Sequence, residues 1–402
     1  MRNGRIRILH VITCLHGGAG WHVYQLAKHL DHRRFDVRLA YAPGYPLDAR
    51  IEREGIPHTL LHWRRTLDPV ATLRGAWDLM RLLEAEPVDI VHAHCSIAGV
   101  LGRRAAAWHR VPHVLFSVHA LASRDYQPAW RKRACLMVER AMDRYADRYF
   151  VFTEGLKNQI VQRGISRPGK IEIIPHGIEV SACPSAEARA CARHRLGLGA
   201  GELAVVVAGR LEPQKGLTYL IQSFAAVVRQ VPAARLILLG DGPLQASLER
   251  QARAVGVAHA VRFLGWREDV AELLPGADLF CMPSLWEALP YALIEAMMCR
   301  LPIVASAVDS MPDVLGHGAF GTLVPPADPD RLAHAIVTLL RDPERRQVIA
   351  AAARRHAACT YGLSGMIARY EAAYAAIAGC ATVPARPVEL VTEAETQECA
   401  RR

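Results

Sequence analysis

The sequence predicts an α/β protein of two domains, each built around a parallel β-sheet. Short apolar runs typical of buried strands alternate along the chain with segments of helical periodicity. The chain has 402 residues, which suits two domains of about 150–200 residues better than one. Because strands and helices alternate, we expect parallel strands joined by right-handed crossovers in both domains.

The first half of the chain contains a regular series of predicted strands and helices. The expected strands are Arg5–Ile12, Phe35–Ala42, His58–Leu61, Asp89–His94, His113–Val118, the start of Asp147–Glu154, and Ile171–Ile174. The expected helices are Trp21–Leu30, Leu47–Glu54, Pro69–Glu84, Ser96–Trp108 and Pro128–Tyr145. We place the first domain at residues 1–178.

A second series follows a connecting segment rich in Ser, Ala, Arg, Pro and Gly, Glu179–Ala200. Its expected strands are Leu203–Ala208, Arg235–Leu239, Val261–Leu264, Ala277–Met282 and a strand opening at Ile303. Its expected helices include Arg331–Arg341, Glu344–Ala358 and Gly365–Ala378. We place the second domain at residues 179–362 and expect residues 380–402 to be a disordered tail.

Composition favours a soluble globular protein, with 51% hydrophobic and 22% charged residues. The N-terminal apolar run is short and broken by His10, and no stretch reaches about 18 uncharged apolar residues, so we expect neither a signal peptide nor a membrane-spanning helix. The ten cysteines include no C-x-x-C pair, which indicates reduced thiols rather than a disulfide framework or a zinc site. We therefore expect a cytoplasmic protein.

The net charge of +10 is confined to the first half of the chain. Residues 1–180 contain 27 Lys and Arg against 17 Asp and Glu, whereas residues 181–402 contain 22 of each kind. No basic motif interleaved with aromatic residues is present, so nucleic acid is not an expected partner. An anionic membrane surface or a phosphate-bearing acceptor fits this charge better.

Two glutamates flank the start of a predicted helix in the second domain. Glu287 lies between the strand Ala277–Met282 and a helix that we expect to begin at Pro290. Glu295 lies about one and a half turns inside that helix, roughly 8 Å along its axis. A helix N-terminus attracts phosphate, and the carboxylates beside it can accept hydrogen bonds from sugar hydroxyls. This order suits the hexose, diphosphate and ribose of a nucleotide diphosphate sugar. The simpler alternative is that Glu287 is an ordinary surface residue and Glu295 an ordinary half-buried helix residue, and that neither binds a ligand.

Two cations, Arg210 and Lys215, lie five residues apart on a predicted loop between strand and helix. Arg offers a bidentate fork and Lys a point charge, which together suit a diphosphate. The alternative is that both residues are ordinary surface charges that bind no ligand. Gly17 and Gly18 lie between the first strand and its helix, where glycines can cradle phosphate or simply form a tight turn.

Histidines mark the carboxyl end of two strands in the first domain. His119 follows the strand His113–Val118, and ligands of parallel sheets gather at such ends, so His119 is a candidate site residue. His92 and His94 lie on one face of another strand, as a metal-binding pair would. No third ligand is evident from the sequence, so we expect no metal there.

The central stretch resembles a known family. Ser284–Glu287, seven residues, Glu295–Met297 and then Leu301–Ser306 resemble the E-x7-E signature of the retaining glycosyltransferases of family 4, and Gly209–Gly216 resembles their G-R-x-x-x-x-K-G motif. Pro175–Ile178 resembles the motif that ends their first domain, where Asn is common in place of His176. This chain has Ala288 where the family usually has Gly. The resemblance covers about residues 5–378.

The resemblance implies the GT-B fold, with two Rossmann-like, doubly wound domains facing a central cleft. The first domain would bind the acceptor, the second would bind the nucleotide sugar, and a closing helix at about 363–379 would pack back on the first domain. It also implies retaining transfer of a hexose-type sugar without a metal or cofactor, from a UDP-sugar or, as a second choice, GDP-mannose.

The resemblance also assigns the site. It implies catalytic roles for Arg210, Lys215, Glu287 and His119, and acceptor contacts from Gly18, His119 and His176. It implies that the donor is bound by Gly17, Gly18, Gly209, Arg210, Lys215, Trp266, Val270, Glu287, Ala288, Leu289, Pro290 and Glu295.

The acceptor is expected to be a saccharide or a polyprenyl-diphosphate-linked saccharide of bacterial surface or exopolysaccharide synthesis. Pro128–Tyr145 carries an apolar stripe (Trp130, Ala134, Met137, Ala141 and Tyr145) beside basic residues. The stripe either packs in the core or meets the anionic inner face of the cytoplasmic membrane, to which the protein would then bind peripherally. A soluble acceptor is the alternative. Two other functions also stay open: a nucleotide-sugar epimerase, and a non-catalytic subunit that binds nucleotide.

Overall fold

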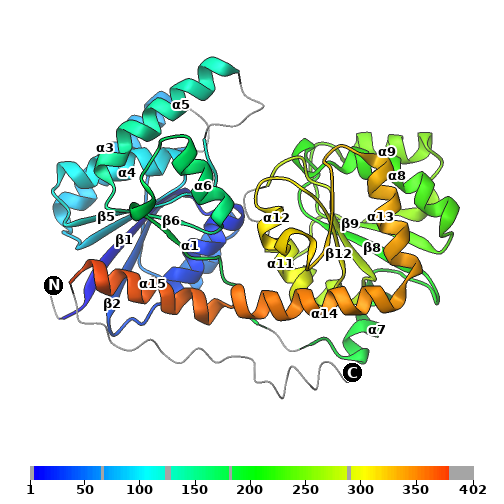
Figure 1. Cartoon of the computed structure of the whole chain (residues 1–402). Coiled ribbons are helices and arrows are strands. Elements are labelled where there is room, and N and C mark those ends of the chain that lie inside the picture. Colours follow the sequence, from blue (N-terminus) through cyan, green and yellow to red (C-terminus); the bar gives the residue numbers. More distant parts are fainter. Residues whose placement is uncertain (1–3, 65–67, 123–127, 181–182, 288–290, 380–402) are drawn as a thin grey trace. The chain divides into compact units, whose positions relative to one another are not determined.

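The computed structural model describes the chain except residues 1–3, 65–67, 123–127, 181–182, 288–290 and 380–402. The described residues form two compact units, one comprising residues 4–177 and 364–379 and the other residues 178–363 (Figure 1). Each unit has a parallel sheet with connecting helices, so the predicted fold class is confirmed.

The first unit is built on a sheet of seven parallel strands in the order β3-β2-β1-β4-β5-β6-β7 within the described residues. Its strands are β1 (Ile6–Cys14), β2 (Phe35–Ala42), β3 (His58–Leu60), β4 (Ile90–His94), β5 (His113–Ser117), β6 (Arg148–Val151) and β7 (Ile171–Ile173). Its main helices are α1 (Gly17–His29), α2 (Asp48–Arg53), α3 (Pro69–Ala85), α4 (Ser96–Trp108), α5 (Ala129–Met142), α6 (Glu154–Gln162) and α15 (Leu363–Ile377).

The order of the first sheet reverses between β1 and β4. Successive strands run outward from β1 on one side and from β4 on the other. His10 of β1 lies directly opposite His92 of β4 in the parallel register. In open α/β sheets such a switch point opens a crevice at the carboxyl ends of the strands, where ligands bind.

The second unit repeats this arrangement with six parallel strands in the order β10-β9-β8-β11-β12-β13 in the part of the chain described. Its strands are β8 (Leu203–Ala208), β9 (Ala234–Leu239), β10 (Val261–Phe263), β11 (Leu279–Met282), β12 (Ile303–Ser306) and β13 (Thr322–Val324). Its helices are α7 (Ala186–Arg195), α8 (Leu217–Gln230), α9 (Gln245–Ala254), α10 (Val270–Leu273), α11 (Tyr291–Met298), α12 (Met311–Val314), α13 (Pro329–Arg341) and α14 (Pro343–Thr360). Here the switch point lies between β8 and β11.

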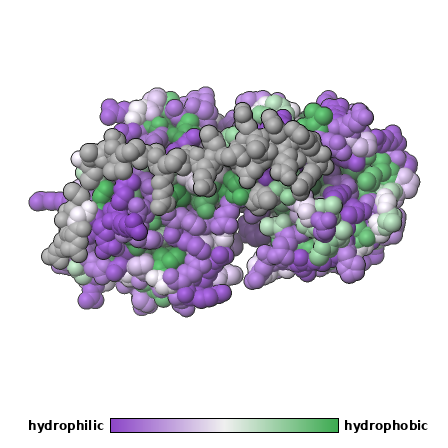
Figure 2. Space-filling view, turned by 90° about the horizontal axis from the view of Figure 1, so that it is seen from below, coloured by the Kyte–Doolittle hydropathy of each residue, from purple (hydrophilic) through white to green (hydrophobic). Residues whose placement is uncertain are grey.

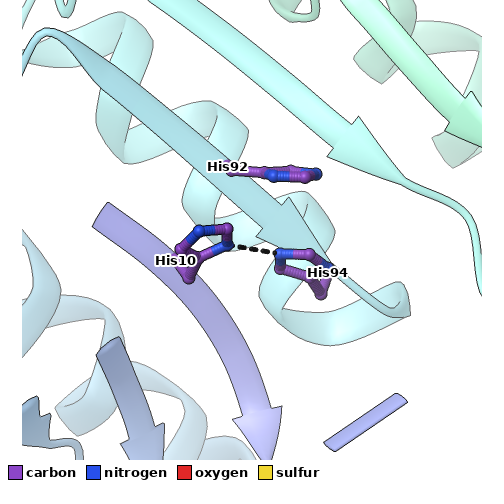
Figure 3. A group of neighbouring side chains, drawn as sticks. All are labelled: His10, His92 and His94. Carbon is purple, nitrogen blue, oxygen red and sulfur yellow. Dashed lines mark hydrogen bonds between the residues drawn. The ribbon is translucent and has the colours of Figure 1, made fainter. Parts of the chain in front are cut away.

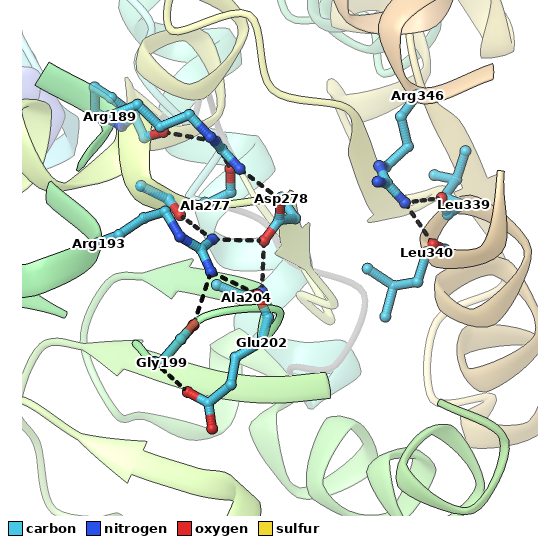
Figure 4. A network of polar contacts seen from close by, with 12 residues as sticks. Arg189, Arg193, Gly199, Glu202, Ala204, Ala277, Asp278, Leu339, Leu340 and Arg346 are labelled. Atoms are coloured by element: carbon cyan, nitrogen blue, oxygen red, sulfur yellow. Dashed lines mark hydrogen bonds and ion pairs between the residues drawn. The ribbon is translucent and has the colours of Figure 1, made fainter. Parts of the chain in front are cut away.

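An ionic network fixes the amino-terminal edge of the second sheet (Figure 4). Arg189 and Arg193 of α7 reach Asp278 with N–O distances of 2.6 and 3.1 Å. The same carboxylate accepts a hydrogen bond from the backbone N–H of Ala204 at 2.8 Å. Asp278 therefore ties α7 to the starts of β8 and β11, at the edge opposite their carboxyl ends.

Three sequence-based expectations about the first unit and the cysteines need correction. Helix α1 begins at Gly17, four residues before the predicted start, because the glycines form its first turn instead of a separate loop. The apolar stripe of α5 does not pack in the core, since Trp130 is 72% and Met137 69% exposed. Cys183 is disulfide-bonded, which departs from the expectation of reduced thiols.

The view in Figure 2 shows a face that is largely hydrophilic, with apolar side chains in scattered areas. Among the residues that the structure describes, no helix combines the length and the apolar character needed to cross a membrane.

Candidate active site

Close backbone contacts bring three loops together at the carboxyl edge of the second sheet. Gly216 has φ +62°, and a Cβ atom there would lie 2.0 Å from the carbonyl oxygen of Pro283. Gly240 has φ +142°, and its Cβ would lie 2.1 Å from the carbonyl oxygen of Gly209. Only glycine tolerates these positions, because the backbones meet where a side chain would lie. The loops after β8, β9 and β11 are thereby packed together at the switch point.

Lys215 and Glu287 form an ion pair at this edge, between loops 72 residues apart. Glu287 is only 5% exposed. Its Oε1 also accepts a hydrogen bond from Ser284 Oγ at 2.8 Å, and its backbone N–H donates to Asp309 Oδ2 at 2.8 Å. These contacts fix the carboxylate and compensate its buried charge.

Arg210 lies on the same loop as Lys215 and is more exposed. Its guanidinium contacts Glu212 Oε1 at 2.6 Å, and 42% of its side chain is exposed. Such an exposed pair between near neighbours contributes little stability, so an arriving anion can compete for the guanidinium at low cost.

Glu295 is the fifth residue of α11 and is half-buried. Its carboxylate has no hydrogen-bond or ion-pair partner in the described part of the chain, and burial raises its pKa above the usual range for glutamate. A hydroxyl that donates to this carboxylate would offset the cost of burial. Ala288, Leu289 and Pro290 lie outside the described residues.

The loop that contains Trp266 and Val270 reaches the same edge from β10. The backbone N–H of Gly240 donates to the carbonyl of Gly265 at 2.7 Å, which ties this loop to the loop after β9. Trp266 is 57% exposed and Val270 begins α10. Five predicted donor residues of the second unit therefore lie on loops that are joined at one edge of the sheet: Gly209, Arg210, Lys215, Trp266 and Glu287. Val270 begins α10 and Glu295 lies within α11.

In the first unit, Gly17 and Gly18 form the first turn of α1, with Gly17 exposed. The first N–H groups of a helix have no partner within the helix, so this end can bind an anion. His119 and His176 follow β5 and β7, and both are buried. Their ring centroids are 5.2 Å apart, so the predicted acceptor residues of this unit include a packed pair.

His22 of α1 also belongs to this group, although it was not predicted from the sequence as a site residue. Its ring stacks on that of His176 with centroids 4.2 Å apart, and it lies 5.4 Å from that of His119. It is fully buried, and neither of its ring nitrogens has a hydrogen-bond partner among the described residues. The signal available in the sequence was its place in the first helix after the central strand β1, near the switch point.

A second histidine group lies deeper in the same sheet. One ring nitrogen from each of His10, His92 and His94 lies within 4.8 Å of the others (Figure 3). Three imidazoles can bind zinc, but both ring nitrogens of His92 and of His94 are already engaged in hydrogen bonds. The group also contains no carboxylate to offset the charge of a buried dication. The expectation that no metal binds here stays a prediction.

All six histidines near the first switch point have pKa values far below the usual range. Burial lowers the pKa of His10 and of His119 to about 3, and lowers those of the other four in the same direction. The other four are His22, His92, His94 and His176. At neutral pH this group is therefore uncharged, and its members act as hydrogen-bonding groups rather than cations.

Comparison with known proteins agrees with this architecture. The family model "Glycosyl transferases group 1" matches residues 191–356, and "Glycosyl transferase 4-like domain" matches residues 17–177. D-inositol 3-phosphate glycosyltransferase of Salinispora arenicola is 30% identical over 72% of this chain and 69% of its own length. This chain belongs to the group 1 glycosyltransferases.

Two other proteins match over a larger share of the chain. An Escherichia coli enzyme, UDP-Gal:alpha-D-GlcNAc-diphosphoundecaprenol alpha-1,3-galactosyltransferase, is 26% identical over 85% of this chain and 89% of its own length. The crystal structure of Anabaena HepE in complex with UDP has a TM-score of 0.80 at 23% identity, covering 92% of this chain and 100% of HepE. The fold is therefore GT-B, as expected from the resemblance.

Proposed function

We propose that this protein is a retaining, metal-independent glycosyltransferase of family 4, which transfers a hexose from a nucleotide diphosphate sugar to a saccharide acceptor. The observation that carries the proposal is the Lys215–Glu287 pair at the β8–β11 switch point, with Arg210 on the same loop. At this position the two cations can bind a diphosphate, and the fixed carboxylate can bind the hydroxyls of a hexose. The family 4 assignment rests on the E-x7-E pattern, in which Glu295 is the second glutamate.

The roles of these residues follow from their chemistry. Arg210 and Lys215 would stabilise the negative charge that develops on the leaving diphosphate, which preorganised cations do without a metal. Glu287, held by Ser284 and Asp309, would orient the hexose. Glu295 would accept hydrogen bonds from the two ribose hydroxyls. We propose that the second unit binds the donor in this way and that the first unit binds the acceptor through Gly18, His119 and His176.

We infer a UDP-sugar as the donor and keep GDP-mannose as the second choice. The relative from Escherichia coli uses UDP-Gal and an acceptor linked to diphosphoundecaprenol, according to its name. A lipid-linked saccharide acceptor of bacterial surface or exopolysaccharide synthesis would also account for the excess of positive charge in the first half of the chain.

We predict that the two glutamates differ in what they bind. Glu295→Gln should weaken binding of the free nucleoside diphosphate about tenfold, because a carboxylate accepts hydrogen bonds from a diol more strongly than an amide does. Glu287→Gln should leave the free nucleotide within about twofold and weaken only the intact nucleotide sugar. Titration calorimetry with UDP and with a UDP-hexose measures both. Equal UDP affinity in the two variants would refute the ribose role of Glu295.

The exposed faces of α3 and α5 support peripheral binding to an anionic membrane. Trp130 and Met137 are exposed on α5, whose residues Arg131, Lys132 and Arg133 supply positive charge. The helix α3 exposes Val70, Leu73 and Trp77 at helical spacing. Because α4 packs against both helices, α3 and α5 lie on the same side of the sheet (Figure 1). Apolar side chains beside basic ones are the pattern of interfacial helices.

We predict that the protein co-sediments with vesicles containing anionic phospholipid at low salt and is released at about 0.5 M salt, where the Debye length is only a few ångströms. Changing Arg131, Lys132 and Arg133 together to Ser should weaken binding about 100-fold, since each basic residue contributes about 1 kcal/mol. The control is the pair Arg250→Ser and Arg253→Ser, which are exposed on α9 of the second unit. No vesicle binding at low salt would favour a soluble acceptor.

A panel of nucleotide sugars tests the donor assignment. The matching donor should stabilise the protein against heat, by about 2.7 kcal/mol at 100 times its dissociation constant. Release of nucleoside diphosphate should then require an acceptor and should persist in the presence of a chelator. Binding without any release would instead indicate a nucleotide-binding subunit. Conversion of the nucleotide sugar into its epimer in the absence of an acceptor would indicate an epimerase.

A further inference from the structure

Two adjoining surface pockets lie beside α3 in the first unit, at a place that the residues proposed for catalysis do not occupy. Their volumes are 490 and 420 Å³, and His62 and Arg74 line both of them. Pockets that bind small molecules have volumes of about 300–1,000 Å³. We call the two pockets together the α3 groove. Its walls include the side chains of Leu60, Val70, Leu73 and Trp77.

These four apolar side chains of the α3 groove are exposed. On α3, Val70 is 61%, Leu73 72% and Trp77 66% exposed, and their spacing of three and four residues places them on one face of the helix. Leu60, the last residue of β3, is 44% exposed and lines the same pocket as Val70. Single exposed apolar residues are common on protein surfaces, whereas a contiguous group that lines a hollow indicates a binding surface.

The α3 groove also contains a cation that is available to a ligand. Arg74 is exposed, and within the described ranges it has no hydrogen-bond or ion-pair partner. The acidic residues of the groove are already engaged by backbone groups. Asp68 caps α3 by accepting two backbone N–H groups at 3.1 Å, and Asp78 accepts the backbone N–H of His62 at 3.0 Å. The groove therefore offers an approaching ligand an apolar wall and an unpaired guanidinium.

The α3 groove begins at the carboxyl edge of the first sheet. Pro43 and Leu61, which directly follow β2 and β3, both line it. Gly18, which we propose to contact the acceptor, follows β1, the strand beside β2. From this edge the groove continues along the first turns of α3, and Val70 and Trp77 are separated by roughly 10 Å of helix. The groove thus leads away from the edge at which the saccharide of the acceptor would bind.

We propose that the α3 groove binds the lipid part of a polyprenyl-diphosphate-linked acceptor, with the prenyl chain on Leu73 and Trp77 and the diphosphate at Arg74. An apolar wall with an unpaired cation is complementary to an apolar chain with an anionic head. The same face of α3 belongs to the surface proposed to meet the membrane, so a chain leaving the bilayer reaches the groove directly. That the lipid carries a saccharide rests on the proposed function, whereas binding of a prenyl diphosphate needs no sugar transfer.

Titration calorimetry of the full-length protein with farnesyl diphosphate tests the α3 groove. The titration contains no vesicles, and saturating UDP occupies the proposed donor site. Farnesyl diphosphate should bind, and farnesol and inorganic diphosphate should bind at least tenfold more weakly, because each lacks one half of the ligand. Trp77→Ala and Arg74→Ser should each weaken the binding of farnesyl diphosphate about tenfold.

Two exposed residues of the same unit that line neither pocket supply matched controls. Trp108→Ala on α4 and Arg81→Ser on α3 should leave the affinity for farnesyl diphosphate within about twofold. Equal affinity in Trp77→Ala, Arg74→Ser and these controls would overturn the proposal. A dimer that Trp77→Ala dissociates would instead identify a second copy as the occupant. Vesicle binding that Trp77→Ala abolishes, without binding of farnesyl diphosphate, would identify the bilayer alone. Either result would also overturn the proposal.

Kinetics with two acceptors tests whether the α3 groove acts in the reaction. Trp77→Ala and Arg74→Ser should raise KM about tenfold for the saccharide linked to prenyl diphosphate, with little change in kcat, and should leave KM unchanged for the same saccharide on a soluble aglycone. Equal losses with both acceptors would contradict a lipid site. If the wild type transfers no sugar, the proposed function fails while calorimetry still decides the groove. If transfer occurs and calorimetry shows no effect of the two variants, the groove fails and the proposed function stands.

Discussion

Replacing Lys215 by Ala should lower turnover by about 10²- to 10³-fold, the usual effect of removing one preorganised group that stabilises charge in a transition state. Lys215 is the cation that the structure places against the buried carboxylate of Glu287. Arg210→Ala should cost about 10²-fold, because its guanidinium is on the same loop but more exposed. Steady-state release of nucleoside diphosphate at saturating donor measures both effects.

The matched control for these variants is Arg250→Ala, which removes an exposed cation from α9 of the same unit. Its turnover should stay within about twofold of wild type, since exposed charges contribute little. Circular dichroism spectra should be unchanged in all three variants. Turnover within about twofold in Lys215→Ala would show that the loop after β8 does not hold the diphosphate.

Mild acid should unfold the protein through its buried histidines. Burial lowers the pKa of His10 and of His119 from the ordinary value of 6.5 to about 3, and lowers those of His22, His92, His94 and His176 well below it. Below pH 6.5 the unfolded chain binds protons that the folded chain does not. Stability is therefore complete above this pH and decreases as the pH falls.

The expected size of this effect is large. His10 and His119, whose pKa values fall to about 3, each cost about 1.4 kcal/mol of unfolding free energy per pH unit below 6.5, or about 2 kcal/mol at pH 5. Together they cost about 4 kcal/mol, which is a large share of the stability of a typical domain. The other four histidines act in the same direction. Thermal or denaturant unfolding followed between pH 7.5 and 4.5 measures it.

A single variant separates this effect from general acid sensitivity. His22→Phe removes a buried titratable ring that makes no hydrogen bond among the described residues, so its acid-unfolding midpoint should move to lower pH. His334→Phe, which alters an exposed histidine of α13, should leave the midpoint unchanged. Full stability of the wild type at pH 4.5 would contradict the neutral, buried state of the group.

The alternation of strands and helices was predictable because each element has its own local pattern. The bounds of β2 and α4 agree with the residues predicted from periodicity. The start of α1 was not predictable, because glycines usually mark loops, whereas Gly17 and Gly18 here belong to the first turn of the helix. The exposure of Trp130 on α5 was also not predictable, since an apolar stripe has the same pattern whether it packs in a core or faces outward.

The candidate site shows the same division between local and non-local information. Arg210 and Lys215 were found from their spacing, and the two glutamates from their motif. The pairing of Lys215 with Glu287 depends on β8 and β11 lying side by side. The hydrogen bonds that join His94 to His10 and to His119 depend on the register of β1, β4 and β5. Such contacts are set by sheet order, which the sequence pattern does not specify.

Analysis of the reaction product tests the central proposal most directly. The wild-type protein is incubated with the donor that the panel identifies and a saccharide linked to polyprenyl diphosphate, and the products are analysed by mass spectrometry and NMR. We predict an acceptor that has gained one hexose, with the anomeric configuration of the donor retained, and one equivalent of nucleoside diphosphate. An unaltered acceptor together with an intact or epimerised nucleotide sugar would contradict the account.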